Sequence, residues 1–403
     1  MIEELLNVVQ PYAWGSRSAL ATLRGERPSD KPEAELWMGA HPLAPSRLAS
    51  TGESLPAVIT RQPALQLGNA IDQQYRGKLP FLLKLLAAAT PLSLQAHPSL
   101  EQAAAGYAAD EAAGIPLDAP HRNYKDPNHK PELLCALGEF WALCGFRPVP
   151  ATLMLLDELE LPALAPYRKS LAQSPDQHGI QRVFSTWMQA SAEAQRALAD
   201  ATANACRARL GSTSRFAEVW GWAVRLAELY PGDIGLLGAL LLNLIRLEPG
   251  EAIYLPAGNL HAYLGGTAIE LMASSDNVLR GGLTPKHVDV PELLRVLDFR
   301  PISVEPLLPQ AHGLEQVYVT QAREFRLSYF DLDSESITVP ITGPEIWLVV
   351  RGAFELGSVS LGPARSAFVS ADSGSLVVAG KGRIFRASVG TFAPTVARPA
   401  QPG

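Results

Sequence analysis

Three short stretches of the chain carry side chains that can ligate a metal ion. In L-S-L-Q-A-H-P, Gln95 and His97 alternate with apolar residues, and this period of two predicts a strand with both side chains on one face. N-H-K-P-E-L supplies Glu132, and N-L-H-A-Y supplies His261. Two imidazoles, one carboxylate and one amide oxygen suit zinc, and also iron or manganese. Taken singly, each of these histidines is more often a hydrogen-bonded core or surface residue than a ligand.

Basic residues accompany these candidate ligands. Lys84 interrupts the apolar run L-P-F-L-L-K-L-L, and Lys130 lies two residues before Glu132. Arg280 and Lys286 lie in N-V-L-R-G-G-L-T-P-K, where Thr284-Pro285 predicts a helix start that would favour an anion. The formal net charge of the chain is -6, so an anionic ligand has to be bound by a local basic cluster. Together these residues predict a pocket for a phosphorylated small molecule.

The composition excludes several classes of protein. The chain has 403 residues, 47% of them hydrophobic and 18% charged, which predicts two or three globular domains. Its negative charge argues against nucleic acid and membrane partners. The three cysteines lack C-x-x-C spacing and are expected to be reduced core thiols. The longest apolar run, 234–245, is too short to cross a bilayer, and no secretory signal is recognisable, so we expect a cytoplasmic protein.

The elements that must position these residues are mainly strands. Residues 1–150 predict short strands with one helical patch at 100–113, which Ser99 and Gln102 would begin with a capping box. Residues 151–245 have helical periodicity, and strands return after 246. We therefore expect a mainly β protein with an α insertion. Its domains would be a discontinuous catalytic β domain (1–150 and 246–300), an inserted helical domain (151–245), and a C-terminal β domain without a metal site (301–403).

Several long blocks, in this order, make the chain resemble the type I phosphomannose isomerases of the cupin superfamily. The blocks are Q-P-Y-A-W-G-S, A-E-L-W-M-G-A-H-P, L-P-F-L-L-K-L-L-A-A-A-T-P-L-S-L-Q-A-H-P, N-H-K-P-E-L, and the stretch 254–286 from Y-L-P-A-G-N-L-H to D-N-V-L-R-G-G-L-T-P-K. The resemblance implies two cupin-like jelly-roll β domains with a helical insertion, and one zinc ion per chain. The last hundred residues match the family only in general pattern.

The resemblance also implies roles for individual residues. The zinc ligands would be Gln95, His97, Glu132 and His261. Catalytic roles fall on Arg280, Lys130 and His129; the base is open among His129, Lys130, Glu270 and a metal-bound water, and we favour the His129–Lys130 pair. The substrate-binding residues would be Lys84, Ser93, Tyr263, Glu270, Asp276 and Lys286.

The implied reaction interconverts mannose 6-phosphate and fructose 6-phosphate through a cis-enediol. We expect a monomer that acts on a small sugar phosphate, either in mannose breakdown or in supplying precursors for GDP-mannose. Two other readings of the same residues are an iron-dependent oxygenase with two histidines and a carboxylate, and a sugar-binding cupin that is not an enzyme. The neutral Gln95 and the surrounding basic residues argue against the oxygenase, and the presence of Arg280 and Lys130 argues against a protein that only binds sugar.

Overall fold

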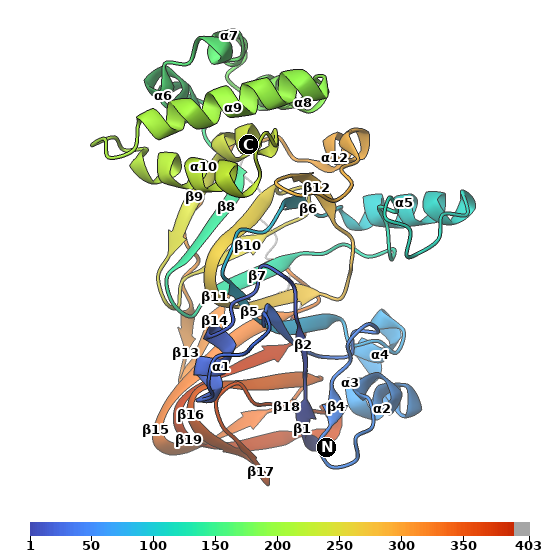
Figure 1. Ribbon diagram of the computed structural model, residues 1–403. Helices are drawn as coiled ribbons and strands as arrows, with labels where there is room; N and C mark the ends of the chain where they lie inside the picture. The colour runs from blue at the N-terminus through green and yellow to red at the C-terminus, as the bar shows by residue number, and fades with distance from the viewer. Residues whose placement is uncertain (391–403) are drawn as a thin grey trace, which may run out of the picture. The chain divides into compact units, whose positions relative to one another are not determined.

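The structure, a computed structural model, describes residues 1–390 (Figure 1). Its backbone forms two compact units. The larger unit comprises residues 9–36 and 84–308; the smaller comprises residues 1–8, 37–83 and the described residues from Pro309 onward. Antiparallel sheets dominate both units, and helices are inserted between the strands, so the expected mainly β fold class is confirmed.

The larger unit is built on a sheet in the order β10-β7-β11-β5-β3-β2, to which β6, β8, β9 and β12 add a second ladder. The strands that lie wholly or partly in this unit are β2 (Val8–Gln10), β3 (Glu35–Met38), β5 (Phe81–Ala88), β6 (Leu94–Ala96), β7 (Glu132–Ala136), β8 (Phe140–Phe146), β9 (Leu242–Leu247), β10 (Ala252–Leu255), β11 (His261–Ala273) and β12 (Leu279–Gly282).

Strand β11 belongs to both ladders. Its first residues pair with β6 and β8, and its later residues, from Ala268 to Met272, pair with β7. Between the two stretches the register shifts at Tyr263/Gly265, and Gly266 has φ 127°, a conformation that favours glycine. This bend lets one strand join the two ladders around a core that includes Phe140 and Tyr263.

The helices of the larger unit are α1 (Ala19–Arg24), α5 (Leu100–Ala112), α6 (Val149–Leu159), α7 (Ala165–Gln173), α8 (Gln177–Met188), α9 (Ala192–Ala208), α10 (Ala217–Leu229), α11 (Gly235–Leu241) and α12 (Val290–Val296), with a 3-10 turn at Pro162–Leu164. Helices α6 to α11 gather at one end of β8 and β9 (Figure 1). They share a core around Phe184, Trp187 and Trp220, which the apolar periodicity of this segment predicts.

Two expectations about helix starts have opposite outcomes. The capping box of α5 is confirmed, since the Ser99 hydroxyl accepts from the Gln102 amide and the Gln102 side chain accepts from the Ser99 amide. The helix start at Thr284-Pro285 is wrong. The Thr284 amide donates instead to Asp233, and α12 begins at Val290 behind the capping residue Asp289.

The smaller unit holds a sheet in the order β13-β14-β15-β19-β16-β18-β1-β4, with β17 paired to β16. Its strands are β1 (Ile2–Leu6), β4 (Arg47–Leu48), β13 (Gln310–His312), β14 (Glu315–Tyr318), β15 (Arg326–Pro340), β16 (Glu345–Leu356), β17 (Val359–Leu361), β18 (Ser366–Val369) and β19 (Ser375–Ser388). Apolar side chains that alternate along β15, β16 and β19 meet in one core around Trp347.

Short helices in the first 150 residues were not expected. Besides α1, the structure has α2 (Leu55–Arg61), α3 (Pro63–Leu67) and α4 (Asn69–Tyr75), so the prediction of a single helical patch there is wrong. Each has five to seven residues, too few to display a period of 3.6. A 3-10 turn also occurs at Ala371–Ser373. Over residues 1–390, no helix has the length and apolar character needed to span a membrane.

Candidate metal centre

The candidate metal ligands lie at the ends of three strands of the larger unit. Gln95 lies within β6 and His97 follows the end of that strand, whereas Glu132 and His261 are the first residues of β7 and β11. His261 lies directly opposite Gln95 in the β11–β6 ladder. Residues directly opposite each other in a ladder point to the same face, so the sheet itself brings Gln95 and His261 together.

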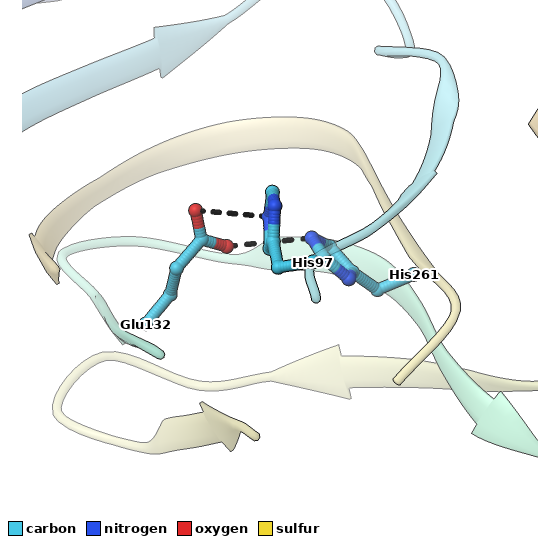
Figure 2. A group of neighbouring side chains, drawn as sticks. All are labelled: His97, Glu132 and His261. Atoms are coloured by element: carbon cyan, nitrogen blue, oxygen red, sulfur yellow. Dashed lines mark ion pairs between the residues drawn. The ribbon is translucent and has the colours of Figure 1, made fainter. Parts of the chain in front are cut away.

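Figure 2 shows the carboxylate of Glu132 facing the rings of His97 and His261. Oε1 of Glu132 is 3.3 Å from Nε2 of His97, and Oε2 is 3.3 Å from Nε2 of His261. One potential ligand atom from each of the three residues lies within 4.8 Å of the others, and each side chain is about 1% exposed. The expected grouping of these three residues is therefore present.

Backbone carbonyls fix the orientation of both imidazoles. Nδ1 of His97 is 2.7 Å from the carbonyl oxygen of Asn277, and Nδ1 of His261 is 3.0 Å from that of Asn259. A carbonyl only accepts, so each Nδ1 carries the proton, and in a neutral ring Nε2 presents a lone pair. Burial lowers the pKa of His97, partly offset by Glu132, which keeps its ring neutral.

The charges at the centre fit a bound cation. Burial alone would raise the pKa of Glu132, but the positive charge beside it, to which the Lys130 ammonium 3.2 Å away contributes, holds that pKa well below its usual range. An ionised carboxylate therefore faces the Nε2 lone pairs of His97 and His261, and Nε2 of His97 has no hydrogen-bond donor. Such an arrangement is repulsive until a cation lies between the three groups. Nitrogen and carboxylate donors of this kind suit zinc.

Gln95 lies at the edge of this cluster. Its Nε2 lies 3.3 Å from Nε2 of His261. A half-turn of the carboxamide exchanges its nitrogen and oxygen, and the oxygen at that distance could then serve as a fourth ligand. The side chain is partly exposed, whereas His97, Glu132 and His261 are buried.

A buried chain of polar groups leads away from Glu132. The hydroxyl of Tyr263 donates to Oε2 of Glu132 across 3.4 Å and also contacts Glu270. Glu270 accepts from the Lys84 ammonium at 2.8 Å, and Glu35 lies 3.7 Å from the same ammonium. Burial would lower the pKa of Lys84, but the two carboxylates raise it above its ordinary value. Lys84, predicted to bind substrate, thus has its charge balanced inside the protein.

Arg280 extends the row of side chains that begins at His261. It lies opposite Gln95 in the β12–β6 ladder, on the same face as the candidate ligands. The guanidinium is partly buried, and burial lowers its pKa. Burial also lowers the pKa of Lys286, and the charge of Arg280 adds to this effect. The structure therefore places Arg280 opposite Gln95, and the exposed Lys286 lies within electrostatic reach of Arg280.

The other predicted residues lie on the segments that carry the ligands. Ser93 precedes β6 and is partly exposed, as are His129 and Asp276. Lys130 is 8% exposed, and its ammonium is paired with Glu132. All predicted site residues belong to the larger unit.

Sequence reasoning missed three residues that support the centre: Glu35, Asn259 and Asn277. Glu35 is the second carboxylate beside Lys84, and the two asparagines orient the histidines through their backbone carbonyls. A backbone carbonyl leaves no signal in the residue type. The only available hint was that each of the three lies inside one of the long blocks quoted above.

Comparison with known proteins identifies the family. Residues 2–149 match the family model described as phosphomannose isomerase type I, catalytic domain. The mannose-6-phosphate isomerase of Escherichia coli is 41% identical over 96% of this chain and 99% of its own length. That of Bos taurus is 35% identical over 78% of this chain and 77% of its own length.

Solved structures agree with the sequence comparison. A crystal structure of mannose 6-phosphate isomerase bound with zinc and yttrium is 37% identical, covers 97% of this chain and 100% of its own, and gives a TM-score of 0.89. A zinc-bound holo structure is 38% identical at the same coverage, with a TM-score of 0.88. The fold, the His–Glu–His cluster and these similarities lead to one assignment: the chain belongs to the type I phosphomannose isomerase family.

Proposed function

We propose that this chain is a zinc-dependent mannose-6-phosphate isomerase, which interconverts mannose 6-phosphate and fructose 6-phosphate through a cis-enediol. The observation that carries the proposal is the buried carboxylate of Glu132 facing the lone pairs of His97 and His261. Its relatives, from bacteria to mammals, are named mannose-6-phosphate isomerases. Family membership favours this activity over an iron-dependent oxygenase or a sugar-binding cupin without catalysis.

His97, Glu132 and His261 would hold one zinc ion, with the Gln95 oxygen as fourth ligand after the half-turn of its carboxamide. When bound, the ion supplies Lewis acidity to the oxygens on C1 and C2 of the sugar. The ligand set contains a single anion, Glu132, so the loaded centre retains positive charge. Positive charge suits a reaction whose difficult step places negative charge on those oxygens.

Arg280 supplies a second positive charge on the same face. Its backbone lies on β12 opposite Gln95, and from there its partly buried guanidinium would donate hydrogen bonds to the enediol oxygens. We assign the proton transfer between C1 and C2 to the His129–Lys130 pair. The Lys130 ammonium is paired with Glu132, whereas His129 is partly exposed and therefore better placed to exchange a proton with substrate.

The remaining predicted residues divide by burial into two groups of substrate contacts. Ser93, Asp276 and Lys286 are partly or fully exposed, and Lys286 suits the phosphate because it adds a point charge beside Arg280. Lys84, Glu270 and Tyr263 are buried and paired with one another. We assign these three to the floor of the site, where their fixed polar atoms meet sugar hydroxyls.

We further propose that catalysis resides in residues 1–150 and 246–300, with 151–245 as a helical insertion and 301–403 as a second β domain. One candidate metal cluster occurs in the part of the chain that the structure describes, and its residues fall within the first of these divisions. No histidine follows His312 in the sequence.

We propose a cytoplasmic monomer without nucleic acid or membrane partners, for which the net charge of -6 is the support.

The decisive experiment is conversion of mannose 6-phosphate to fructose 6-phosphate by purified protein. The activity should disappear after a chelator has removed the metal and return when zinc is added. His261→Ala should fail to retain zinc, whereas His312→Ala, which alters an exposed histidine, should behave as wild type. Turnover that persists in chelator, or metal-replete protein without turnover, would refute the proposal.

A further inference from the structure

Asn277 is a fully buried residue between β11 and β12 that contacts two of the three segments supplying candidate metal ligands. It is 0% exposed. Its backbone carbonyl reaches His97, and its side chain reaches the loop that precedes Glu132. Asn277 itself is neither a candidate metal ligand nor one of the residues assigned to substrate binding. Asn277 lies three residues before Arg280 in the same block, D-N-V-L-R.

The contact with His97 runs through the backbone. The carbonyl oxygen of Asn277 accepts from Nδ1 of His97 at 2.7 Å. This bond fixes the tautomer and the plane of the ring, and it directs Nε2 toward Oε1 of Glu132. A displacement of the Asn277 backbone would therefore rotate the His97 ring away from the centre.

The side-chain carboxamide uses all of its hydrogen-bonding capacity on one turn of the preceding loop. Its oxygen accepts from the amides of Lys125 at 2.7 Å and Asp126 at 3.3 Å. Its nitrogen donates to the carbonyls of Asp126 at 2.7 Å and Asn128 at 2.8 Å. The next residues along the chain are His129, Lys130 and, after Pro131, the ligand Glu132.

Neighbouring contacts join the same two segments. The carboxylate of Asp126 accepts from the backbone amide of Asp276 at 2.8 Å and from the Ser275 hydroxyl at 3.2 Å. The Ser275 oxygen in turn accepts from the Asn277 amide at 3.2 Å. Hydrogen bonds thus join the segment 275–277 to the turn 125–128, and the Asn277 side chain makes most of them.

We propose that Asn277 is a positioning residue for the metal centre, which holds His97 and the Glu132 loop in the geometry that zinc requires before the ion arrives. The inference rests on the proposed function, because it concerns zinc at that site. A residue of this kind lowers the cost of binding, since the ligands lose little freedom when the ion enters. Its loss should weaken metal binding rather than abolish it.

The test measures zinc affinity and ligand geometry, both apart from turnover. Asn277→Asp keeps the size and one accepting oxygen but replaces the donating nitrogen with an oxygen that faces the carbonyls of Asp126 and Asn128. Competition with a chromophoric chelator should show zinc affinity about 10- to 100-fold lower than that of wild type. The visible spectrum of the cobalt-substituted protein should also change, because it reports the arrangement of the ligands.

Asn7→Asp is the matched control, because it makes the same substitution in the smaller unit, whereas the candidate ligands lie in the larger one. The Asn7 carboxamide donates to the Ser366 hydroxyl and accepts from the Ser46 hydroxyl, each at 2.8 Å. This variant should lower the thermal stability and leave zinc affinity and the cobalt spectrum unchanged. An equal loss of zinc affinity in Asn7→Asp would show that general destabilisation is the cause, and would overturn the inference.

Ser275→Ala provides a second test of the inference in case Asn277→Asp does not fold. It removes one hydroxyl from the same set of contacts and should lower zinc affinity about 2- to 5-fold. The inference is overturned if folded Asn277→Asp binds zinc as wild type does, or if Asn277→Asp fails to fold and Ser275→Ala binds normally. If the wild-type protein itself binds no zinc, the proposed function is wrong and the inference falls with it.

Discussion

At the scale of single residues, the centre depends on which atoms carry protons. The carbonyls of Asn259 and Asn277 hold the proton on Nδ1 of the two histidines, so both Nε2 atoms are available to a metal. Residue types and the family resemblance together predicted a ligand set of Gln95, His97, Glu132 and His261, and the structure groups His97, Glu132 and His261. The carbonyls that orient the rings were not predictable, because every residue has one and only the folded backbone places it.

Arg280→Ala should lower turnover about 100- to 1,000-fold without loss of zinc. The guanidinium lies beside Gln95 on the face of the candidate ligands, where negative charge develops during the reaction. Steady-state kinetics and metal analysis of the same preparation measure both quantities. Arg300→Ala, which removes a highly exposed arginine paired with Asp298, should leave both unchanged. Wild-type turnover in Arg280→Ala would remove Arg280 from the mechanism.

Lys84→Met should destabilise the protein by about 3–5 kcal/mol, because Glu35 and Glu270 remain buried without their shared cation. The exposed pair of Lys381 and Asp333 provides the control, and Lys381→Met should cost less than about 1 kcal/mol. Urea unfolding at neutral pH measures both. An equal cost in the two variants would contradict the role given to the buried pair.

The same variant should have a distinctive pH dependence. In the wild-type protein the pKa of Lys84 is raised by the two carboxylates, so its stabilising contribution is complete below about pH 10 and is lost only above it. In Lys84→Met the two buried carboxylates are left without their shared cation, and their mutual repulsion weakens as the pH falls. The deficit relative to wild type should therefore be smaller at pH 5.5 than at pH 8. A deficit that grows on acidification would contradict this account.

At the scale of elements, local patterns predicted long helices and strands better than short ones. The capping box of α5 could be predicted, because it depends on residues three apart in sequence. The strands β15 and β16 could also be predicted, because alternation of apolar residues is a local pattern. Helices α2 to α4 have too few turns for a periodic signal. The helix start expected at Thr284 is wrong, and the amide of Thr284 donates instead to Asp233, which is distant in sequence.

Ser99→Ala should cost about 1 kcal/mol of stability, because it removes the acceptor for the Gln102 amide at the start of α5. Denaturant unfolding measures the change. Ser99→Gly should cost only a few tenths of that amount, since glycine leaves the first turn open to water. Zinc affinity should not change in either variant, although Ser99 lies two residues from His97, because the ring of His97 is held by Asn277. A fall in zinc affinity would show that α5 also positions the ligand.

At the scale of the whole chain, sequence patterns could not predict which distant segments pair with each other. Strand β1 pairs with β18, where Ile2 lies opposite Val369, and β4 completes the same sheet. Hydrophobic alternation identifies a strand and its buried face, but it does not name the partner. The residues predicted to form the site nevertheless all lie in the larger unit.

Zinc should stabilise the larger unit, which contains the candidate ligands. An ion that binds only the folded state, at a free concentration 100 times its Kd, adds about 2.7 kcal/mol. For a unit of this size that raises the unfolding temperature by about 5–10 °C. Calorimetry with zinc and with chelator measures the shift, and a chain with two units can show more than one transition. Glu132→Gln should abolish the shift, because it removes the only anionic ligand and leaves Lys130 without its carboxylate. A shift of the same size in Glu132→Gln would mean that zinc acts at another place on the protein.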